Sequence, residues 1–236
     1  MIIDNKKIKS SEINKMFTTI AKHYDYTNHV LSAGLDFYWK KCLVRAVCAV
    51  RPKTIVDLAT GSGDIAFAVY EKLNSNAIVT GIDFCKEMLN IAKKKSVKQK
   101  KNIKFIEGDC LKLPLRDNSV DALTISFGLR NLENRIKGLK EMHRVLKSNG
   151  SLFILEFTQP NLLLKPFYFF YLEIILPKIA SYFNFNHSAY QYLGASIKQF
   201  PSKKSLSDEI KEANFKYVAV KGLTGSITAI HHARIE

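Results

Sequence analysis

The sequence predicts an α/β protein built on a mostly parallel sheet with helices on both faces. The first observation is an apolar run, Thr54–Val56, that leads into a glycine-containing turn at residues 57–64 and then into the helical pattern of Ile65–Val69. The second is that short apolar stretches alternate with helical patterns along much of the chain. Strands that alternate with helices form parallel sheets, because each crossover helix returns the chain to the same edge.

Stretches with strand character recur from the first apolar run to the end of the chain. They lie at residues 54–57, 77–83, 103–107, 120–126, 151–157, 217–220 and 226–233. Helical patterns lie at residues 16–25, 37–50, 86–92, 136–146 and 205–213, and residues 26–36 read as a loop or short helix. Asn149 and Gly150 are a typical C-terminal stop for the helix near 136–146, so the fifth strand is expected to begin at Ser151.

Residues Thr158–Phe200 interrupt this alternation with an aromatic-rich insertion that is expected to be helical. Two aromatic runs, Phe167–Leu172 and Tyr182–His187, stand inside it. Such a segment can form a lipophilic substrate pocket or a membrane-facing helix, and extra helices of an ordinary core explain the same pattern equally well.

Length and charge limit the architecture and the partners. The chain has 236 residues with 47% hydrophobic content, which suits a single domain over residues 16–236 after a polar, mobile arm at residues 1–15. Thirty-six Lys and Arg against 21 Asp and Glu give a formal charge of +15. An excess of this size predicts an anionic neighbour, either nucleic acid or a membrane surface, and does not choose between them.

The cysteines and apolar segments indicate a cytoplasmic protein that is soluble or peripheral to a membrane. Cys42, Cys48, Cys85 and Cys110 lack C-x-x-C spacing, and the opening residues lack the apolar core of a signal peptide. The longest apolar stretch, in the insertion, is broken by charged residues and prolines. No cluster with metal-ligand spacing stands out, so we expect no metal site.

The glycine turn predicts a nucleotide-like cofactor, because Gly61 and Gly63 allow a sharp turn and the helix after Gly63 offers unpaired N–H groups. A dinucleotide is the rival, since Ala66 completes G-x-G-x-x-A and Asp83 stands twenty positions after Gly63. Asp57, at the end of the strand, would repel a pyrophosphate but can accept hydrogen bonds from the ammonium of a methionine moiety. S-adenosylmethionine is therefore the expected cofactor, and a turn without any ligand is the remaining alternative.

Acidic and polar residues follow the later strands, at the edge where open α/β sheets bind ligands. Asp83 ends the second strand and can bind both ribose hydroxyls, although an acid here could instead cap the next helix. Asp109 follows the third strand and can accept from an adenine amino group. After the fourth strand, Arg130 and Asn131 are expected to face the ligand crevice.

These segments together resemble the class I S-adenosylmethionine methyltransferases, and more narrowly the ubiquinone/menaquinone C-methyltransferase family. The specific motifs are Tyr24–Ser32 with Trp39-Lys40, Ile125–Asn131, Arg144–Lys147 through Phe157, and Tyr190–Leu193 with Ser196-Ile197. The resemblance implies a Rossmann-like class I fold and cofactor contacts at Ser62, Asp83, Asp109, Cys110 and Ser126. It also implies a lipophilic prenylated quinol as the substrate, as either demethylmenaquinol or a ubiquinone precursor.

Ring methylation of a quinol requires loss of a hydroxyl proton, because the phenolate makes the ring carbon nucleophilic. Arg130 is a permanent cation that can stabilise the phenolate, and Asn131 can orient the oxygen. The base is open. The candidates are His29, His187, Tyr190 and a water held by Asp25 or Asn28.

Two other functions compete with quinol methylation. RNA methylation would use the basic charge, but no recognised RNA-binding module is present and no nucleic-acid partner is expected. A non-catalytic cofactor-binding protein is the third reading. The basic charge and the aromatic insertion together suggest peripheral attachment at the inner face of an anionic membrane, and a homodimer remains an option.

Overall fold

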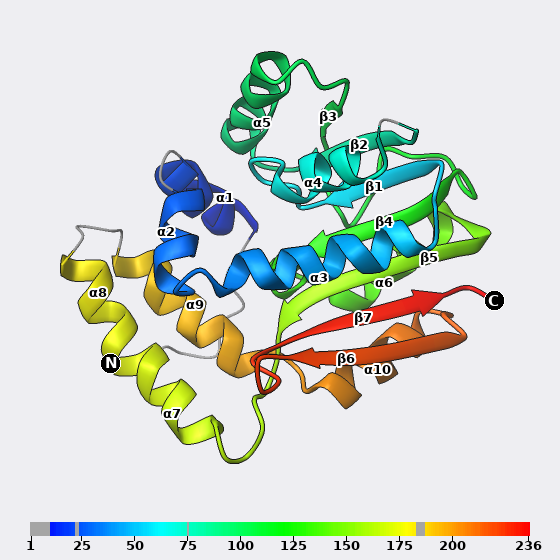
Figure 1. Ribbon diagram of the computed structural model, residues 1–236. Coiled ribbons are helices and arrows are strands. Elements are labelled where there is room, and N and C mark those ends of the chain that lie inside the picture. Colours follow the sequence, from blue (N-terminus) through cyan, green and yellow to red (C-terminus); the bar gives the residue numbers. More distant parts are fainter. Residues whose placement is uncertain (1–9, 22–23, 75, 183–186) are drawn as a thin grey trace.

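The computed structural model describes residues 10–21, 24–74, 76–182 and 187–236 (Figure 1). Seven strands form one sheet in the order β3-β2-β1-β4-β5-β7-β6. The strands are β1 (Thr54–Leu58), β2 (Ile78–Asp83), β3 (Lys104–Glu107), β4 (Val120–Ser126), β5 (Leu146–Phe157), β6 (Tyr217–Leu223) and β7 (Thr228–Arg234). β1 to β5 pair in parallel, and β7 lies antiparallel between β5 and β6. The seven-stranded, mostly parallel sheet predicted from the sequence is confirmed.

Helices cover both faces of the sheet. They are α1 (Ser10–Ile20), α2 (Tyr24–Leu31), α3 (Leu35–Ala49), α4 (Asp64–Lys72), α5 (Lys86–Lys98), the 3₁₀ turn η2 (Leu129–Asn131), α6 (Arg135–Val145), α7 (Lys165–Phe170), the π-helical η3 (Tyr171–Ile175), α8 (Leu176–Tyr182), α9 (His187–Gln199) and α10 (Lys203–Glu212). One apolar layer joins the sheet to α3 and α4 through side chains such as Leu43 and Phe67, and the other joins it to α6 and α10 through Met142 and Ile210. In Figure 1, α3 crosses in front of the sheet, and α6 and α10 lie behind it.

Several predicted boundaries are wrong. Residues 10–15 belong to α1, which begins at Ser10, and not to a polar arm, because Ile13 in this stretch is buried. The rest of the predicted arm, residues 1–9, lies outside the described residues. The fifth strand begins at Leu146 rather than Ser151, because Leu146 is fully buried and pairs with Val120 at the start of β4. Asn149 therefore lies within β5 and does not stop the helix.

The parallel strands end at one edge, and the helices outside the main layers gather there. α1, α2 and the predicted insertion, which forms α7 to α9, lie beyond the carboxyl ends of these strands (Figure 1). α1 packs on α5, with Phe17 and Ala21 against Met88 and Cys85. In the part of the chain that the structure describes, no helix combines the length and apolarity needed to cross a bilayer.

Candidate functional site

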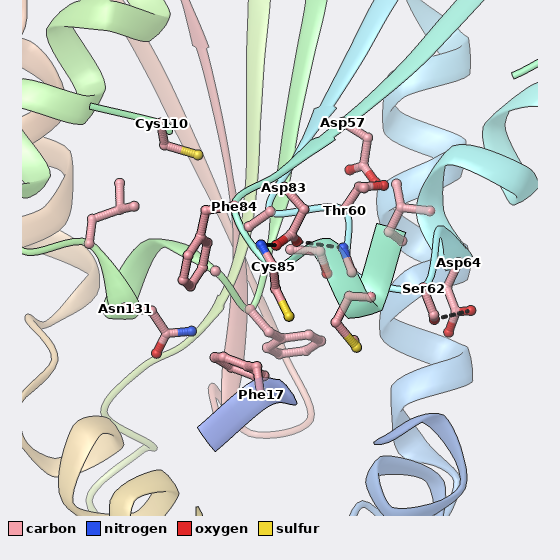
Figure 2. Close-up of a pocket in the computed structure, with 18 of the residues that line it drawn as sticks. Phe17, Asp57, Thr60, Ser62, Asp64, Asp83, Phe84, Cys85, Cys110 and Asn131 are labelled. Atoms are coloured by element: carbon pink, nitrogen blue, oxygen red, sulfur yellow. Dashed lines mark hydrogen bonds between the residues drawn. The ribbon is translucent and has the colours of Figure 1, made fainter. Parts of the chain in front are cut away.

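A cavity of about 200 Å³ opens at the carboxyl ends of β1, β2 and β4 (Figure 2). Most residues predicted to contact the cofactor line it: Asp57, Gly61, Ser62, Asp83, Asp109, Cys110 and Ser126. Gly63 does not line the cavity but stands at the N-terminus of α4, directly after the turn. Phe17 reaches the cavity from α1, so the N-terminal helix forms part of its wall.

The glycines of the turn are required by its geometry. Gly61 and Gly63 have φ values of 56° and 92°, in the left-handed region. A Cβ at Gly63 would lie 2.8 Å from Cε2 of Phe67, which is too close for a real contact. Ala59 and Phe127, at the ends of β1 and β4, also have positive φ values of 49° and 55°. Left-handed non-glycine residues at two adjacent strand ends are typical of a functional site.

Asp83 holds the turn and the start of α5 in place. Its Oδ2 accepts from the Gly61 N–H at 2.8 Å, and its Oδ1 accepts from the Cys85 N–H at 2.8 Å. Burial raises the pKa of Asp83, although these backbone hydrogen bonds oppose the rise. Because a carboxylate has about four acceptor positions, it retains capacity to accept from a hydroxyl group in the cavity.

Asp57 is a buried carboxylate at the end of β1. It accepts hydrogen bonds from the hydroxyls of Thr60 and Thr124, each at 2.6 Å. Burial raises its pKa to about 6, against the opposing effect of these two hydroxyls. A cationic group placed beside such a buried carboxylate would stabilise its ionised form.

Three further residues provide polar atoms or a neutral wall in the cavity. The hydroxyl of Ser126 is buried and has no hydrogen-bond partner among the described residues, so it can bond to a ligand. Asp109 Oδ1 accepts from the Leu111 N–H at 2.8 Å. Burial raises the pKa of Cys110 to about 12, so this side chain is a neutral thiol. All four cysteines are free, and no group of three or more His, Cys, Asp or Glu side chains within the described ranges could hold a metal ion.

A second cavity of about 310 Å³ adjoins the first. Its walls are mainly apolar and aromatic: Leu35, Trp39, Phe127, Phe157, Tyr168, Tyr171, Leu172, Leu176, Leu193, Ile197 and Ile227. They come from α3, from strand ends, and from the insertion helices α7, η3, α8 and α9. Asn28, Lys40 and Phe127 line both cavities, so the two spaces meet at these side chains.

Arg130 lines the second cavity, but its charge is already paired. Its Nη1 donates to Glu156 Oε1 at 2.8 Å and also to the Phe127 carbonyl. The side chains of Arg130 and Glu156 are only 7% and 1% exposed. Asn131 instead lines the first cavity, and its Oδ1 accepts from the Tyr192 hydroxyl at 2.9 Å. The structure thus divides the predicted Arg–Asn pair between the two cavities.

The predicted base candidates differ in what the structure shows of them. His29 lines neither cavity; its Nδ1 lies 2.6 Å from Asp36 Oδ2, and its ring stacks on Phe37 with centroids 4.1 Å apart. Asn28 lines both cavities. His187 and Tyr190 belong to α9, but their side chains, like that of Asp25, lie outside the described residues.

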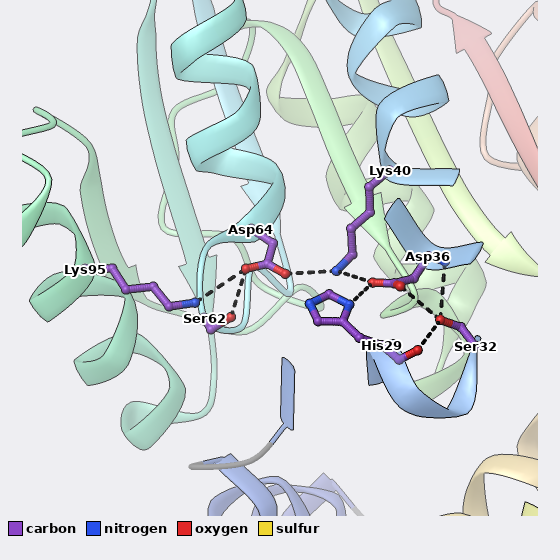
Figure 3. Close-up of polar contacts among 7 residues, drawn as sticks. All are labelled: His29, Ser32, Asp36, Lys40, Ser62, Asp64 and Lys95. Carbon is purple, nitrogen blue, oxygen red and sulfur yellow. Dashed lines mark hydrogen bonds and ion pairs between the residues drawn. The ribbon is translucent and has the colours of Figure 1, made fainter. Parts of the chain in front are cut away.

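An ionic chain that the sequence analysis missed runs along the junction of the cavities (Figure 3). Lys40 Nζ lies 3.1 Å from Asp36 Oδ2 and 2.9 Å from Asp64 Oδ2. Burial alone would lower the pKa of Lys40, but the carboxylates of Asp64 and Asp36 raise it above its usual value. Asp36 and Lys40 are four residues apart on one helix, so this ion pair could have been predicted from the sequence. The approach of Asp64, from another helix, had no signal in the sequence.

Comparison with known proteins gives consistent matches over nearly the whole chain. The profile of the ubiE/COQ5 methyltransferase family matches residues 5–234. A relative from Citrifermentans bemidjiense, named ubiquinone/menaquinone biosynthesis C-methyltransferase UbiE, is 40% identical over 94% of this chain and 96% of its own. A relative from Bacteroides fragilis, named demethylmenaquinone methyltransferase, is 36% identical over 95% of this chain and 93% of its own.

Solved structures support the class I methyltransferase fold. A SAM-dependent methyltransferase of Thermotoga maritima aligns with a TM-score of 0.65 over 94% of this chain and 99% of its own, at 16% identity. One from Aquifex aeolicus aligns with a TM-score of 0.59 over 78% and 82%, at 22% identity. The predicted fold class and family resemblance are confirmed: the chain belongs to the ubiE/COQ5 methyltransferase family.

Proposed function

We propose that this chain transfers a methyl group from S-adenosylmethionine to a ring carbon of a prenylated quinol. The single observation that carries the proposal is the junction of the two cavities, a polar one at the strand ends and an apolar one beside it, at Asn28, Lys40 and Phe127. Methyl transfer requires a donor and an acceptor that meet without water between them. Membership of the family and the names of the relatives support the same reaction.

The residues of the first cavity fit the cofactor. Asp57 would hold the methionine ammonium, Asp83 the ribose hydroxyls, and Asp109 the adenine amino group. Ser62 and Ser126 supply hydroxyls, and the Ser126 hydroxyl has no partner of its own in the described part of the protein. When bound, S-adenosylmethionine supplies an electrophilic methyl group.

The second cavity suits an aromatic ring with an apolar chain. Trp39, Phe127 and Phe157 form one aromatic cluster with ring centroids 4.8 to 6.1 Å apart. Leu172 and Leu176 extend this wall into the insertion. Such surroundings gain free energy by burying apolar area, at about 25 cal/mol per Å².

Product analysis tests the proposed reaction and identifies the quinol. The purified protein is given S-adenosylmethionine and either a short-chain demethylmenaquinol or a short-chain 2-polyprenyl-6-methoxy-1,4-benzoquinol, and methylated products are measured by mass spectrometry. We expect a carbon-methylated product from at least one quinol. Methylation of RNA but of neither quinol, or cofactor binding without any transfer, would contradict the proposal.

We also propose that the protein attaches peripherally to anionic membranes through the start of the insertion. Leu162, Leu163 and Phe167 are 88%, 80% and 71% exposed, and Lys165 lies among them. The same insertion lines the second cavity through Leu172, which is buried, so the aromatic run Phe167–Leu172 has its exposed part at its start. An apolar ridge beside a lipophilic pocket, in a basic protein, favours a lipid surface.

Vesicle co-sedimentation tests this attachment. Wild-type protein should sediment with vesicles of phosphatidylglycerol and phosphatidylcholine at low salt, and less at high salt. The double variant Leu163→Ser/Phe167→Ser should lose the attachment, whereas Val97→Ser, at a residue 80% exposed on α5, should retain it. Equal amounts of wild-type protein in the soluble fraction with and without vesicles would contradict the proposed attachment. Light scattering of the free protein reports whether the exposed ridge joins two copies into a homodimer instead.

A further inference from the structure

The junction of the two cavities contains a carboxylate and an ammonium that the proposed cofactor contacts do not use. Asp36 is 3% exposed and lines the second cavity, and Lys40 lines both cavities. The two side chains are one helical turn apart on α3 and form an ion pair at 3.1 Å. An ion pair in the wall of a mainly apolar pocket is costly to maintain, and perturbed charged groups of this kind cluster at functional sites.

Asp36 retains capacity to accept another hydrogen bond. Its Oδ2 interacts with His29 and Lys40, and its Oδ1 accepts from the Ser32 hydroxyl at 2.9 Å. These contacts use three of the roughly four acceptor positions of a carboxylate. A substrate hydroxyl in the second cavity could take the fourth.

The other buried ion pair at this cavity is built differently. Glu156 does not line either cavity, and its oxygens accept from Arg130 and from the backbone N–H of Phe157 at 2.9 Å. The Arg130 charge is therefore compensated by a carboxylate that cannot meet the substrate. Asp36 is the carboxylate placed in the cavity wall.

We propose that Asp36 accepts the proton of the substrate hydroxyl and that Lys40 stabilises the resulting phenolate, a pair of roles that rests on the proposed methylation of a quinol. The substrate O–H bond breaks, and an O–H bond forms on Asp36. Lys40 then exchanges its contact with the Asp36 carboxylate for one with the phenolate. The apolar pocket gains no unpaired charge in this step, because one anion replaces another beside the same ammonium.

His29 gives the proton a path out of the cavity. Its Nδ1 contacts Asp36 Oδ2 at 2.6 Å, and its side chain is 27% exposed. When Asp36 is protonated, its O–H donates to His29 Nδ1 in the tautomer that carries hydrogen on Nε2. The proton then passes to Nδ1, the imidazolium releases its Nε2 proton to solvent, and the Asp36 carboxylate is restored. Among the described residues, the titratable and charged groups around this site are His29 on α2, Asp36 and Lys40 on α3, Asp64 on α4, Lys95 on α5, Arg130 on η2, Glu156 on β5, Tyr168 on α7, and Tyr171 on η3.

Ionisation of a bound naphthol tests the role of Lys40 without cofactor or turnover. A 2-alkyl-1-naphthol is titrated with the protein, and the fraction of bound naphtholate is measured by absorbance. In the wild type, binding should favour the naphtholate over the neutral naphthol. Lys40→Met should lower the acid ionisation constant of the bound naphthol at least tenfold. Lys40→Arg should recover part of the loss. The matched control is Lys95→Met, since Lys95 also pairs with Asp64 but lines neither cavity. Equal naphthol ionisation in wild type and Lys40→Met would overturn the role of Lys40.

The role of Asp36 as proton acceptor is tested by measuring naphthol ionisation and kcat in the same variant. Asp36→Asn should leave naphthol ionisation equal to or above the wild-type value, because Lys40 loses a competing anion. The same variant should lower kcat about 100-fold, and kcat should then rise with pH as hydroxide replaces the lost base. Unchanged kcat in a folded Asp36→Asn variant would remove Asp36 as the proton acceptor. His29→Gln should lower kcat by a smaller factor, and added imidazole should restore part of the lost kcat.

Two measurements keep this inference separate from the proposed function. If the wild-type protein neither binds the naphthol nor methylates a quinol, the proposed function itself fails. If the wild type methylates a quinol while Asp36→Asn and Lys40→Met match it in rate and naphthol ionisation, only the assignment of these two residues fails. Thermal unfolding and S-adenosylhomocysteine binding of each variant show whether it is folded.

Discussion

The two cavities are built from different kinds of structure. The walls of the first come mostly from turns directly after the parallel strands, and its key groups are fixed by short contacts such as Asp83 to the Gly61 N–H. The walls of the second come from α3 and the insertion helices, which pack through side chains far apart in sequence, such as Leu172 and Ile197. Cofactor binding should therefore depend on single polar contacts, and the second cavity on packing and on two ion pairs, of which Arg130–Glu156 is the more deeply buried.

The largest expected effect comes from breaking that ion pair. Arg130→Ala leaves Glu156, which is 1% exposed, without its cation, and should lower the free energy of unfolding by about 3 to 5 kcal/mol. Arg130→Met/Glu156→Gln removes both charges and keeps an acceptor for the Phe157 N–H, so it should recover much of the loss. Urea unfolding measures both variants.

Turnover of the double variant then decides the chemical role of Arg130. A stable double variant that methylates a quinol at the wild-type rate would make this pair purely structural. A stable variant with little turnover would support the role of Arg130 at the substrate oxygen. A loss of less than 1 kcal/mol in Arg130→Ala would contradict the idea that the pair holds the second cavity together.

Packing in the second cavity gives the next effect. Leu176→Ala, at a residue 2% exposed beside Leu172 and Ile197, should cost about 2 to 3 kcal/mol of stability and raise KM for a quinol. Affinity for S-adenosylhomocysteine should stay unchanged. Leu206→Ala on α10 is the matched control, because it removes the same atoms from a buried site that lines neither cavity. A quinol KM that rises equally in both variants would show that the effect is general destabilisation.

The same difference explains what could be predicted from the sequence. The mostly parallel sheet follows from the alternation of strand and helix patterns. Asp57, Asp83 and Asp109 line one cavity because each lies at or just beyond the carboxyl end of a strand at the same edge of the sheet. Asp64 and Lys40 belong to helices whose relative rotation depends on the whole apolar layer, so no local pattern could bring them together. The pairing of Arg130 with Glu156 was also missed, because these residues lie on η2 and β5 and are 26 residues apart in the chain.

A single polar contact in the first cavity should have an intermediate effect. Asp83→Asn keeps the shape of the side chain but removes the charge that would bind the ribose hydroxyls, so cofactor affinity should fall by about 1 to 3 kcal/mol. Calorimetry with S-adenosylhomocysteine measures the change. Asp121→Asn is the control, because Asp121 accepts from the Thr54 N–H at the opposite end of β1 and lines neither cavity. Equal affinity in wild type and Asp83→Asn would remove Asp83 from the cofactor contacts.

The smallest effect is a dependence of cofactor affinity on pH, which arises from Asp57. Burial raises the pKa of this carboxyl to about 6, so it is ionised at pH 7 and becomes protonated as the pH falls through 6. The ionised form should bind the methionine ammonium, and affinity should be about tenfold weaker at pH 5 than at pH 7. Stability of the unliganded protein should change in the opposite sense. A raised carboxyl pKa opposes folding above that pKa, and the opposition declines as the pH falls from about 6 towards the ordinary value of 3.8.

Calorimetry with S-adenosylmethionine at pH 5, 6 and 7 measures this dependence. Asp57→Asn cannot titrate, so its affinity should be low at every pH and should vary less than that of the wild type. If affinity in the wild type is constant from pH 5 to pH 7, Asp57 does not bind the ammonium, and the polar contacts of the first cavity must be divided differently.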